Sequence, residues 1–490
     1  VGALLLVMFG LIGLTAIPIQ LTPTVDYPIV TVETSWPGRS PEEIVDEITK
    51  EQEEQLKNIS NLKTMRSTSS EGISTITLEF YLGSDITRAL QEVSDALRQV
   101  PDYPDEVDEP TIKDASGAVE SSIAWIIIDL DPEYNEQFPD FDITTLFDPI
   151  DKEIRPMLER IDGVAEVNVY GGREREVRVL ANNEKLAQRG LNIADLLDAL
   201  RRENVNTSAG TIAEGKRDYR VRVVGQFESE EDVLSSVVAI REGRPVYVRD
   251  VATVEIGHTK LRGFVRSFGH PSIAIPFIRQ TNANVIDIME DLRVELDTVR
   301  SDVLPNIGGD AGPHLRMRQV YDETVYIDSS IKLVTQNLWI GGGIAAIVLL
   351  VFLRSFTTTG IVALAIPISV IGTFLILLAL GRTLNVISLA GIAFAVGMVV
   401  DNAIVVLENI YRRYQGGLSP MKAAYEGGRE VWGAVLASTL TTAAVFVPVL
   451  TIQEEAGQLF RDISIAIVGS VLISLVVSMT VIPAACSRSV

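Results

Sequence analysis

The chain has 490 residues, 47% of them hydrophobic, and a formal net charge of −23 at pH 7. This length exceeds what a single hydrophobic core organises, so at least two domains are expected. The acidic balance argues against nucleic acid as a partner, because phosphate binding needs a basic face. It indicates a solvated surface or, as the alternative, a preference for cationic substrates. The single cysteine, Cys486, excludes an intrachain disulfide and a thiolate metal site.

Charge is unevenly distributed along the chain. Of the 42 Lys and Arg residues only eight follow residue 332, and of the 65 Asp and Glu residues only seven do. We therefore predict an α+β membrane protein with an acidic, water-exposed part and a nearly uncharged, helical part. Residues 1–17 are apolar but lack the basic start and cleavage site of a signal peptide, so they are interpreted as a first transmembrane helix whose beginning is missing.

Residues 29–118 have the pattern strand, helix, strand, strand, helix. Ile29–Ser35 alternates between apolar and polar residues, which is the period of a half-buried strand. Ser40 is placed to cap a helix that has Pro41 in its first turn and runs to about Leu56. The remaining predicted elements are strands at 63–68 and 74–82, with Glu71-Gly72 at the turn, and a helix at 85–100.

A similar order recurs after residue 121, so two related modules of the split β-α-β kind are predicted. The predicted elements are a strand at 123–130, a helix at 143–161, a hairpin of 165–170 and 174–180 around Gly171-Gly172, a helix at 192–203, a strand at 272–279 and a helix at 283–299. The interruption at about 204–270 is β-rich, with strands predicted at 219–224 and 246–254, and is interpreted as a small insertion domain. No segment has the spacing of a phosphate loop, a catalytic triad or a zinc site, so no cofactor, metal or enzymatic activity is predicted.

Five apolar runs after residue 330 are long enough to cross a bilayer, which takes about 20 residues. They are 333–353, 355–380, 384–407, 431–452 and 463–485. The Gly- and Pro-containing stretch 411–430 is predicted to be a cytoplasmic link with a short amphipathic helix. Basic residues gather at Arg354, at 412–429 and at Arg488, which places these loops in the cytoplasm and residues of roughly 18–332 in the periplasm or outside the cell.

Asp401 lies well inside the third of these runs and is predicted to be buried at membrane depth. Carboxylates there are costly and usually functional, and one that alternates between a desolvated and a charge-paired setting carries protons. Gly397, one turn earlier, is expected to let a neighbouring helix approach closely. Asn402 would add a polar contact, and Glu408 lies two turns later near the cytoplasmic end, where a structural role is favoured. The alternative for Asp401 is a structural hydrogen bond between helices.

No Lys or Arg lies at mid-span in this chain, so the counter-charge of Asp401 is expected from another polypeptide or an absent part of the protein. An intramembrane aspartyl protease would need a second catalytic aspartate on another span, and no other predicted span contains one.

The whole chain resembles the resistance-nodulation-division (RND) transporters, in particular their AcrB-like hydrophobe/amphiphile exporter branch. No single matching stretch is specific, but the six together are. They are Gly13–Pro23, Trp36–Glu43, Gly163–Val167, Arg249–Ala252, Gly397–Asn402 and Val405–Asn409. The resemblance covers the N-terminal half of such a transporter.

The resemblance implies domains and partners beyond what the residue patterns show. It implies porter subdomain N1 at 29–118, N2 at 119–190 and 270–325, and a docking-domain insertion at 191–269. It also implies a homotrimer in the bacterial inner membrane, a C-terminal half or a second half-size chain, a periplasmic adaptor and an outer-membrane channel. Tyr170 and Ile123 stand where such pumps contact substrate, although both can be core residues. Asn402 replaces a frequent second aspartate, and the arm near Ala209–Tyr219 is short.

The predicted function is proton-driven efflux of small amphiphilic or hydrophobic compounds. Two alternatives remain open at the level of sequence. One is a metal-ion-exporting RND pump, and the other is a proton-coupled accessory to protein export of the Sec type.

Overall fold

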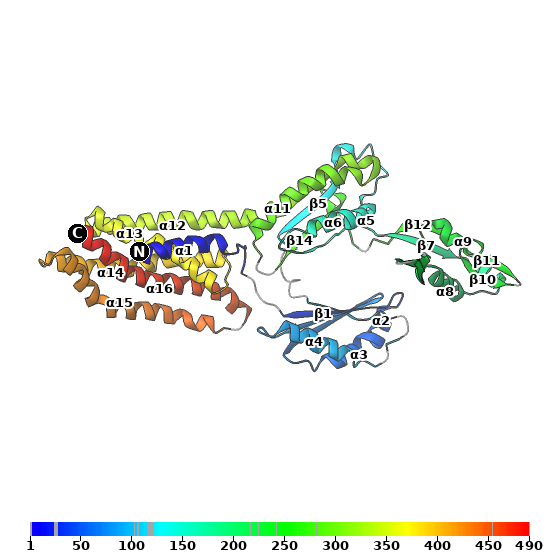
Figure 1. The fold of residues 1–490 in the computed structure, drawn as a ribbon, viewed down its shortest axis with the longest axis horizontal. Coiled ribbons are helices and arrows are strands. Elements are labelled where there is room, and N and C mark those ends of the chain that lie inside the picture. The colour runs from blue at the N-terminus through cyan, green and yellow to red at the C-terminus, as the bar shows by residue number, and fades with distance from the viewer. Residues whose placement is uncertain are drawn as a thin grey trace.

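The computed structural model describes residues 2–23, 28–101, 103–104, 107–114, 122–214, 217–223, 225–241, 243–261, 263–280, 283–452 and 454–489. A helical bundle occupies one end of the molecule, two α/β modules lie next to it, and a smaller insertion forms the far end (Figure 1). The predicted division into a membrane part and a mixed α/β part is therefore confirmed.

The first module is a four-stranded antiparallel sheet with the strand order β2-β3-β1-β4. The side chains of β1 (Ile29–Ser35) alternate between buried and half-buried, as its sequence predicts. Ser40 caps the helix that follows, and Glu43 completes the capping box. The other elements are helix 41–56, formed by α2 (Pro41–Ile44), a π-helical turn (Val45–Thr49) and α3 (Lys50–Leu56), then β2 (Leu62–Ser70), β3 (Ile73–Phe80), α4 (Ile86–Leu97) and β4 (Thr111–Asp114).

The second module repeats this connectivity. Its sheet has the order β6-β14-β5-β15, and β13 pairs with the start of β14. Helices on one face of the sheet bury a core that includes Ile126, Phe277 and Leu292. The elements are β5 (Ala124–Leu130), a helical stretch over 143–159 that includes α5 (Phe147–Pro149) and α6 (Arg155–Glu159), β6 (Val164–Val167), β13 (Val265–Ser267), β14 (His270–Arg279), α11 (Val285–Thr298) and β15 (Leu315–Asp322).

The insertion lies between β6 and β14 of the second module. Its elements are β7 (Arg175–Ala181), α7 (Asn183–Gln188), α8 (Ile193–Glu203), β8 (Thr207–Glu214), β9 (Arg217–Val223), α9 (Glu230–Ser235), β10 (Val237–Arg241), β11 (Arg244–Tyr247), α10 (Val248–Val251) and β12 (Ala252–His258). Strands β7 and β12 pair, as do β8 with β9 and β10 with β11.

Two of the secondary-structure elements predicted for this region are wrong. The hairpin around Gly171-Gly172 does not form, because β6 pairs with β14 whereas β7 pairs with β12 in the insertion. The predicted strand 246–254 is broken by the single turn α10, where Asp250 accepts a hydrogen bond from the Tyr247 amide. The predicted domain boundary at residue 190 also falls inside one hydrophobic core, which holds both Leu186 and Leu191.

Five helices in the described residues are long and apolar enough to cross a membrane, and α1 (Gly2–Ala16) is a shorter apolar helix. The five are α12 (Glu323–Leu353), α13 (Phe356–Ala379), α14 (Val386–Gln415), α15 (Pro420–Leu450) and α16 (Glu455–Ser489). The predicted link at 411–430 is wrong, because α14 runs to Gln415 and α15 begins at Pro420, so only Gly416–Ser419 connect them. Helix α12 follows β15 directly and thus joins the second module to the bundle.

Candidate functional site

Asp401 lies in the middle of α14, but its side chain is exposed in this chain, so the prediction of burial is wrong. It belongs to an exposed stripe that repeats every three or four residues and therefore follows one face of the helix. The stripe consists of Ala390, Phe394, Gly397, Asp401, Val405 and Glu408. Phe394 is 65% exposed, so the surroundings of Asp401 are apolar and uncovered. The opposite side of α14 packs against α13, α15 and α16.

Asn402 points to the other side of α14, as expected for a residue about 100° further around the helix. It is buried, and its side-chain amide donates a hydrogen bond to Thr439 Oγ1 of α15 at 3.2 Å. The structure therefore gives Asn402 a contact between helices and leaves Asp401 as the carboxylic acid at this level of α14.

Two glycines of α14 that precede Asp401, Gly391 and Gly397, have different surroundings. A Cβ at Gly397 would have no neighbouring atom within 4 Å, so no described helix approaches it in this chain, contrary to prediction. A Cβ at Gly391 would lie 2.9 Å from the carbonyl oxygen of Ile463 on α16. The close helix approach thus occurs at Gly391, and Gly397 lies on the uncovered stripe with Asp401.

Glu408 is exposed near the end of α14, on the same stripe. The residue after it, Asn409, is buried and donates hydrogen bonds to the Gly427 carbonyl (2.8 Å) and to Glu430 Oε2 (2.9 Å) on α15. Arg413 also pairs with Glu430 at 2.9 Å. Sequence reasoning missed this polar contact between α14 and α15; the Gly427-Gly428 pair was its only local signal.

Asp401 has no salt bridge to any described residue of the chain. The basic residues of the five long helices lie toward the helix ends, and none lies at mid-span. A carboxylate on an uncovered apolar stripe without a cation is the arrangement expected for one side of an interface between helix bundles.

The second module carries an aromatic surface on the face of its sheet away from the helices. Tyr170 forms a β-bridge with Ala274, is 49% exposed, and stacks on Trp125 with ring centroids 6.5 Å apart. Together with Phe147 and Phe264 it borders a hollow of about 500 Å³. Tyr170 is therefore accessible to a ligand, as a substrate contact requires.

Ile123, the other predicted substrate contact, is 0% exposed. It lies in the core of the second module, and its amide donates to the Phe277 carbonyl at 2.9 Å. The prediction that Ile123 contacts substrate is therefore wrong. A side chain enclosed in the core cannot touch a ligand on the open face, which is the face of the sheet away from the helices.

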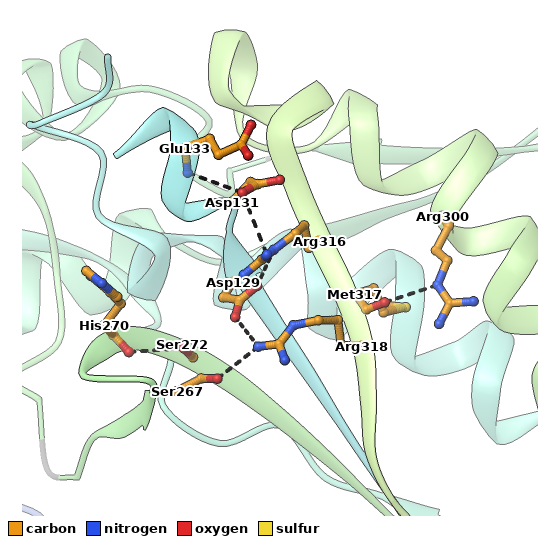
Figure 2. Close-up of polar contacts among 10 residues, drawn as sticks. All are labelled: Asp129, Asp131, Glu133, Ser267, His270, Ser272, Arg300, Arg316, Met317 and Arg318. Atoms are coloured by element: carbon orange, nitrogen blue, oxygen red, sulfur yellow. Dashed lines mark hydrogen bonds and ion pairs between the residues drawn. The ribbon is translucent and has the colours of Figure 1, made fainter. Parts of the chain in front are cut away.

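A buried ion cluster on the same sheet was not predicted (Figure 2). Asp129 of β5 is 3% exposed and accepts hydrogen bonds from Arg316 Nε (3.2 Å) and from the Arg318 guanidinium, both on β15. Arg318 also donates to Ser267 Oγ at 2.9 Å. The cross-strand partner of Arg318 is Ile127 on β5. The sequence offered only the alternation of Arg316 and Arg318, in a segment where no strand was predicted.

Tyr170 and Arg318 share one row across the sheet, because Tyr170 bridges Ala274, Ala274 pairs with Ile127, and Ile127 pairs with Arg318. Residues in register across a sheet project from the same face. The open face thus combines aromatic rings with partly exposed guanidinium groups.

The loop that carries Tyr170 is tied to the helical stretch after β5. Arg173 pairs with Asp142 through its guanidinium, and its amide donates to the Thr144 carbonyl at 2.7 Å. Burial raises the pKa of Asp142, but hydrogen bonds from Thr144 and the charge of Arg173 outweigh this and hold the pKa below its ordinary value of 3.8. Asp142 is therefore ionised at neutral pH, and the tie is intact.

Comparison with known proteins gives concordant results. A sequence profile of the AcrB/AcrD/AcrF family matches residues 1–490. Curated relatives include the proteins named multidrug resistance protein MdtC of Photorhabdus laumondii, Yersinia enterocolitica and Pectobacterium carotovorum, at 32%, 32% and 30% identity over 99% of this chain. The chain spans 46% of the length of each of these relatives. The chain therefore belongs to the AcrB/AcrD/AcrF family of RND transporters.

Proposed function

We propose that the chain is the first half of a secondary transporter that exports small amphiphilic compounds in exchange for protons. The observation that carries this proposal is Asp401, a carboxylate at the middle of a membrane helix on an uncovered apolar stripe. Its charge costs several kcal/mol in lipid unless a cation faces it, so it must be covered by a partner. Protonation of Asp401 would release that partner and change how the helices pack.

The membrane potential can drive export through protons that Asp401 carries. Each proton that crosses a membrane potential of 100 mV supplies about 2.3 kcal/mol, before any contribution from a pH difference. Asn402 cannot titrate in this range and is engaged with Thr439, so we infer that Asp401 acts without a second acid beside it.

We propose the second half of the transporter, or a second copy of the chain, as the partner that covers the stripe. A mid-span lysine or arginine on that partner would supply the counter-charge. The assembly is proposed to be a homotrimer in the bacterial inner membrane that works with a periplasmic adaptor and an outer-membrane channel. The two α/β modules would then be porter subdomains on the periplasmic side, and the insertion would be part of a docking domain.

Amphiphilic substrates are favoured by the open face of the second module, where Tyr170, Trp125 and Phe264 provide apolar contacts and Arg318 provides charge. The names of the curated relatives refer to multidrug resistance, which favours drug-like amphiphiles over metal ions. Among the described residues, no group of three or more His, Cys, Asp or Glu side chains is placed to hold a metal.

The proposal is tested by export of a fluorescent amphiphile from cells that express the complete natural reading frame. Asp401→Asn should abolish export at wild-type protein levels, because an amide of the same shape cannot exchange protons. Glu408→Gln is the matched control on the same stripe and should retain export. Export by Asp401→Asn at the wild-type rate would refute the role of this carboxylate.

A further inference from the structure

A short extended segment after α1, Pro18–Leu21, lies against the residues that precede α14. The Gln20 amide donates to the Leu384 carbonyl (3.0 Å), and the Leu384 amide donates to the Pro18 carbonyl (2.9 Å). The Val386 amide, in the first turn of α14, donates to the Leu21 carbonyl at 3.1 Å. Ile19 and Leu384 thus form a parallel bridge at the beginning of the helix that carries Asp401.

The same segment also holds the beginning of α11 in the second module. The Val285 amide donates to the Ile19 carbonyl at 3.1 Å, and Gln20 Nε2 donates to the Ala283 carbonyl at 3.3 Å. Gln20 is 1% exposed, so its amide is enclosed between the two helix starts. Val285 is itself part of the buried core of the second module. Residues 18–21 therefore connect the starts of α14 and α11 through the five hydrogen bonds named above.

The start of α14 is fixed from its other side by α16. Asn385, the N-cap of α14, accepts a hydrogen bond from the Ser388 amide at 2.8 Å. Its side-chain amide donates to Asp462 Oδ2 on α16 at 2.9 Å. Asp462 is 2% exposed, and its other oxygen lies 3.8 Å from Arg382 Nη1. A buried carboxylate that is paired in this way holds the cap of α14 in one position.

Further along, α14 and α16 are in contact over several turns. Ser474 Oγ donates to the Val399 carbonyl at 2.8 Å, two residues before Asp401 in the chain, and Gly391 lies against the backbone of Ile463. The sixteen residue steps from Asn385 to Asp401 correspond to about 24 Å along the helix axis. A displacement of α14 at Asp401 therefore reaches its start, because the intervening helix is continuous and packs on α16.

The second module has another attachment to the bundle, since β15 continues into α12. Arg293 of α11 donates to Asp322, the N-cap of α12, at 2.9 Å. With a single attachment the module could swing about it as a hinge. With two, at the start of α11 and at the end of β15, it has to follow relative movement of α14 and α12.

We propose that Pro18–Leu21 is a coupling joint that transmits movement of α14 to the second module, with Gln20 and Asp462 as its positioning residues. This inference rests on the proposed function, because it assigns a route from the proton-binding helix to the substrate-binding face. Neither residue contacts substrate or exchanges the transported proton in this scheme. Their loss would leave substrate affinity intact and lower the rate at which protonation is converted into export.

The test uses Gln20→Ala and Asp462→Asn in the complete natural reading frame, with initial export rates measured against substrate concentration. Gln188→Ala on the exposed surface of α7 and Glu454→Gln on the loop before α16 are matched controls. Leaving a buried hydrogen-bond partner without its mate shifts a conformational equilibrium by about fivefold or more, so each joint variant should lower the maximal rate at least about fivefold. The half-saturating concentration should stay within about twofold of wild type, and both controls should behave as wild type.

The double variant tests whether the two residues act on one joint. Residues in one network show non-additive effects, so the double variant should lose less than the product of the two single losses. If Asp462→Asn does not accumulate in the membrane, Gln20→Ala decides alone, since it leaves all the backbone hydrogen bonds of the joint in place. Wild-type maximal rates in Gln20→Ala, or a loss explained by a higher half-saturating concentration, would overturn the inference.

Asp401→Asn is measured in parallel to separate this inference from the proposed function. If Asp401→Asn is inactive while the joint variants export normally, the joint is refuted and the proton-driven function stands. If Asp401→Asn exports normally, the proposed function has failed, and the inference about the joint fails with it.

Discussion

Two glycines on α14 give a sharp prediction, because one is packed against α16 and the other lies on the uncovered face of the same helix. A Cβ at Gly391 would meet the Ile463 carbonyl oxygen at 2.9 Å and Ala466 Cβ at 3.0 Å, whereas a Cβ at Gly397 would meet nothing within 4 Å. Overpacking a tight contact costs about 1–3 kcal/mol. Replacing a helical glycine by alanine recovers up to about 1 kcal/mol of helix propensity.

Gly391→Ala should therefore destabilise the protein by about 0–2 kcal/mol, and Gly397→Ala should stabilise the isolated bundle by up to about 1 kcal/mol. Unfolding of purified protein in detergent, followed by circular dichroism against denaturant, measures the difference. Both variants have the same composition, so that difference reports the local space alone. The packing described for α14 would be contradicted if the two variants were equally stable. It would also be contradicted if Gly397→Ala were less stable than Gly391→Ala in this chain without a partner.

Three further predictions concern the polar contacts. Asp129→Ala should destabilise the protein by about 1–3 kcal/mol, because it removes the buried carboxylate that accepts hydrogen bonds from two partly exposed guanidinium groups; thermal unfolding measures this loss. Asp142→Asn should loosen the Arg173 tie. The pKa of Asp142 is lowered in the folded protein, so the ionised carboxylate stabilises the wild-type fold above pH 3.8. Wild type loses this stabilisation as the pH falls through the lowered pKa. The variant should lack that acid-dependent step when unfolding is measured against pH. Asn402→Leu removes the hydrogen bond to Thr439 and should cost about 0.6–1.7 kcal/mol in detergent unfolding, with export retained.

The local elements of the fold were predictable because their signals are local. The alternation of Ile29–Ser35, the cap at Ser40 and the repeated order of strands and helices all appear where the sequence places them. Apolar runs located the five long helices for the same reason, since hydropathy depends only on composition within a window.

Neither the pairing of strands nor the face of a helix that packs against its neighbours was predictable, because both depend on residues distant in the sequence. Gly171-Gly172 has the composition of a hairpin turn, yet the chain passes there from the sheet of the second module into the insertion. At Ser419-Pro420 the residues of a loop are also those of a helix start, so the predicted link became the first turns of α15.

The candidate site shows the same limit. Hydropathy placed Asp401 at mid-span, but the orientation of its side chain depends on which face of α14 packs against α16, and Gly391 lies at one close point of that contact. The ion cluster at Asp129 was missed because its arginines lie almost 190 residues further along the chain, at positions that only the sheet register brings together.

In the proposed mechanism Asp401 carries the protons that drive export. The most direct test of this mechanism is substrate-driven proton movement in proteoliposomes that contain the complete natural protein, followed with a pH-sensitive dye under an imposed potential. We expect substrate to elicit proton flux in wild type and in Glu408→Gln, and none in Asp401→Asn. Substrate-driven proton flux of wild-type size in Asp401→Asn would contradict this mechanism.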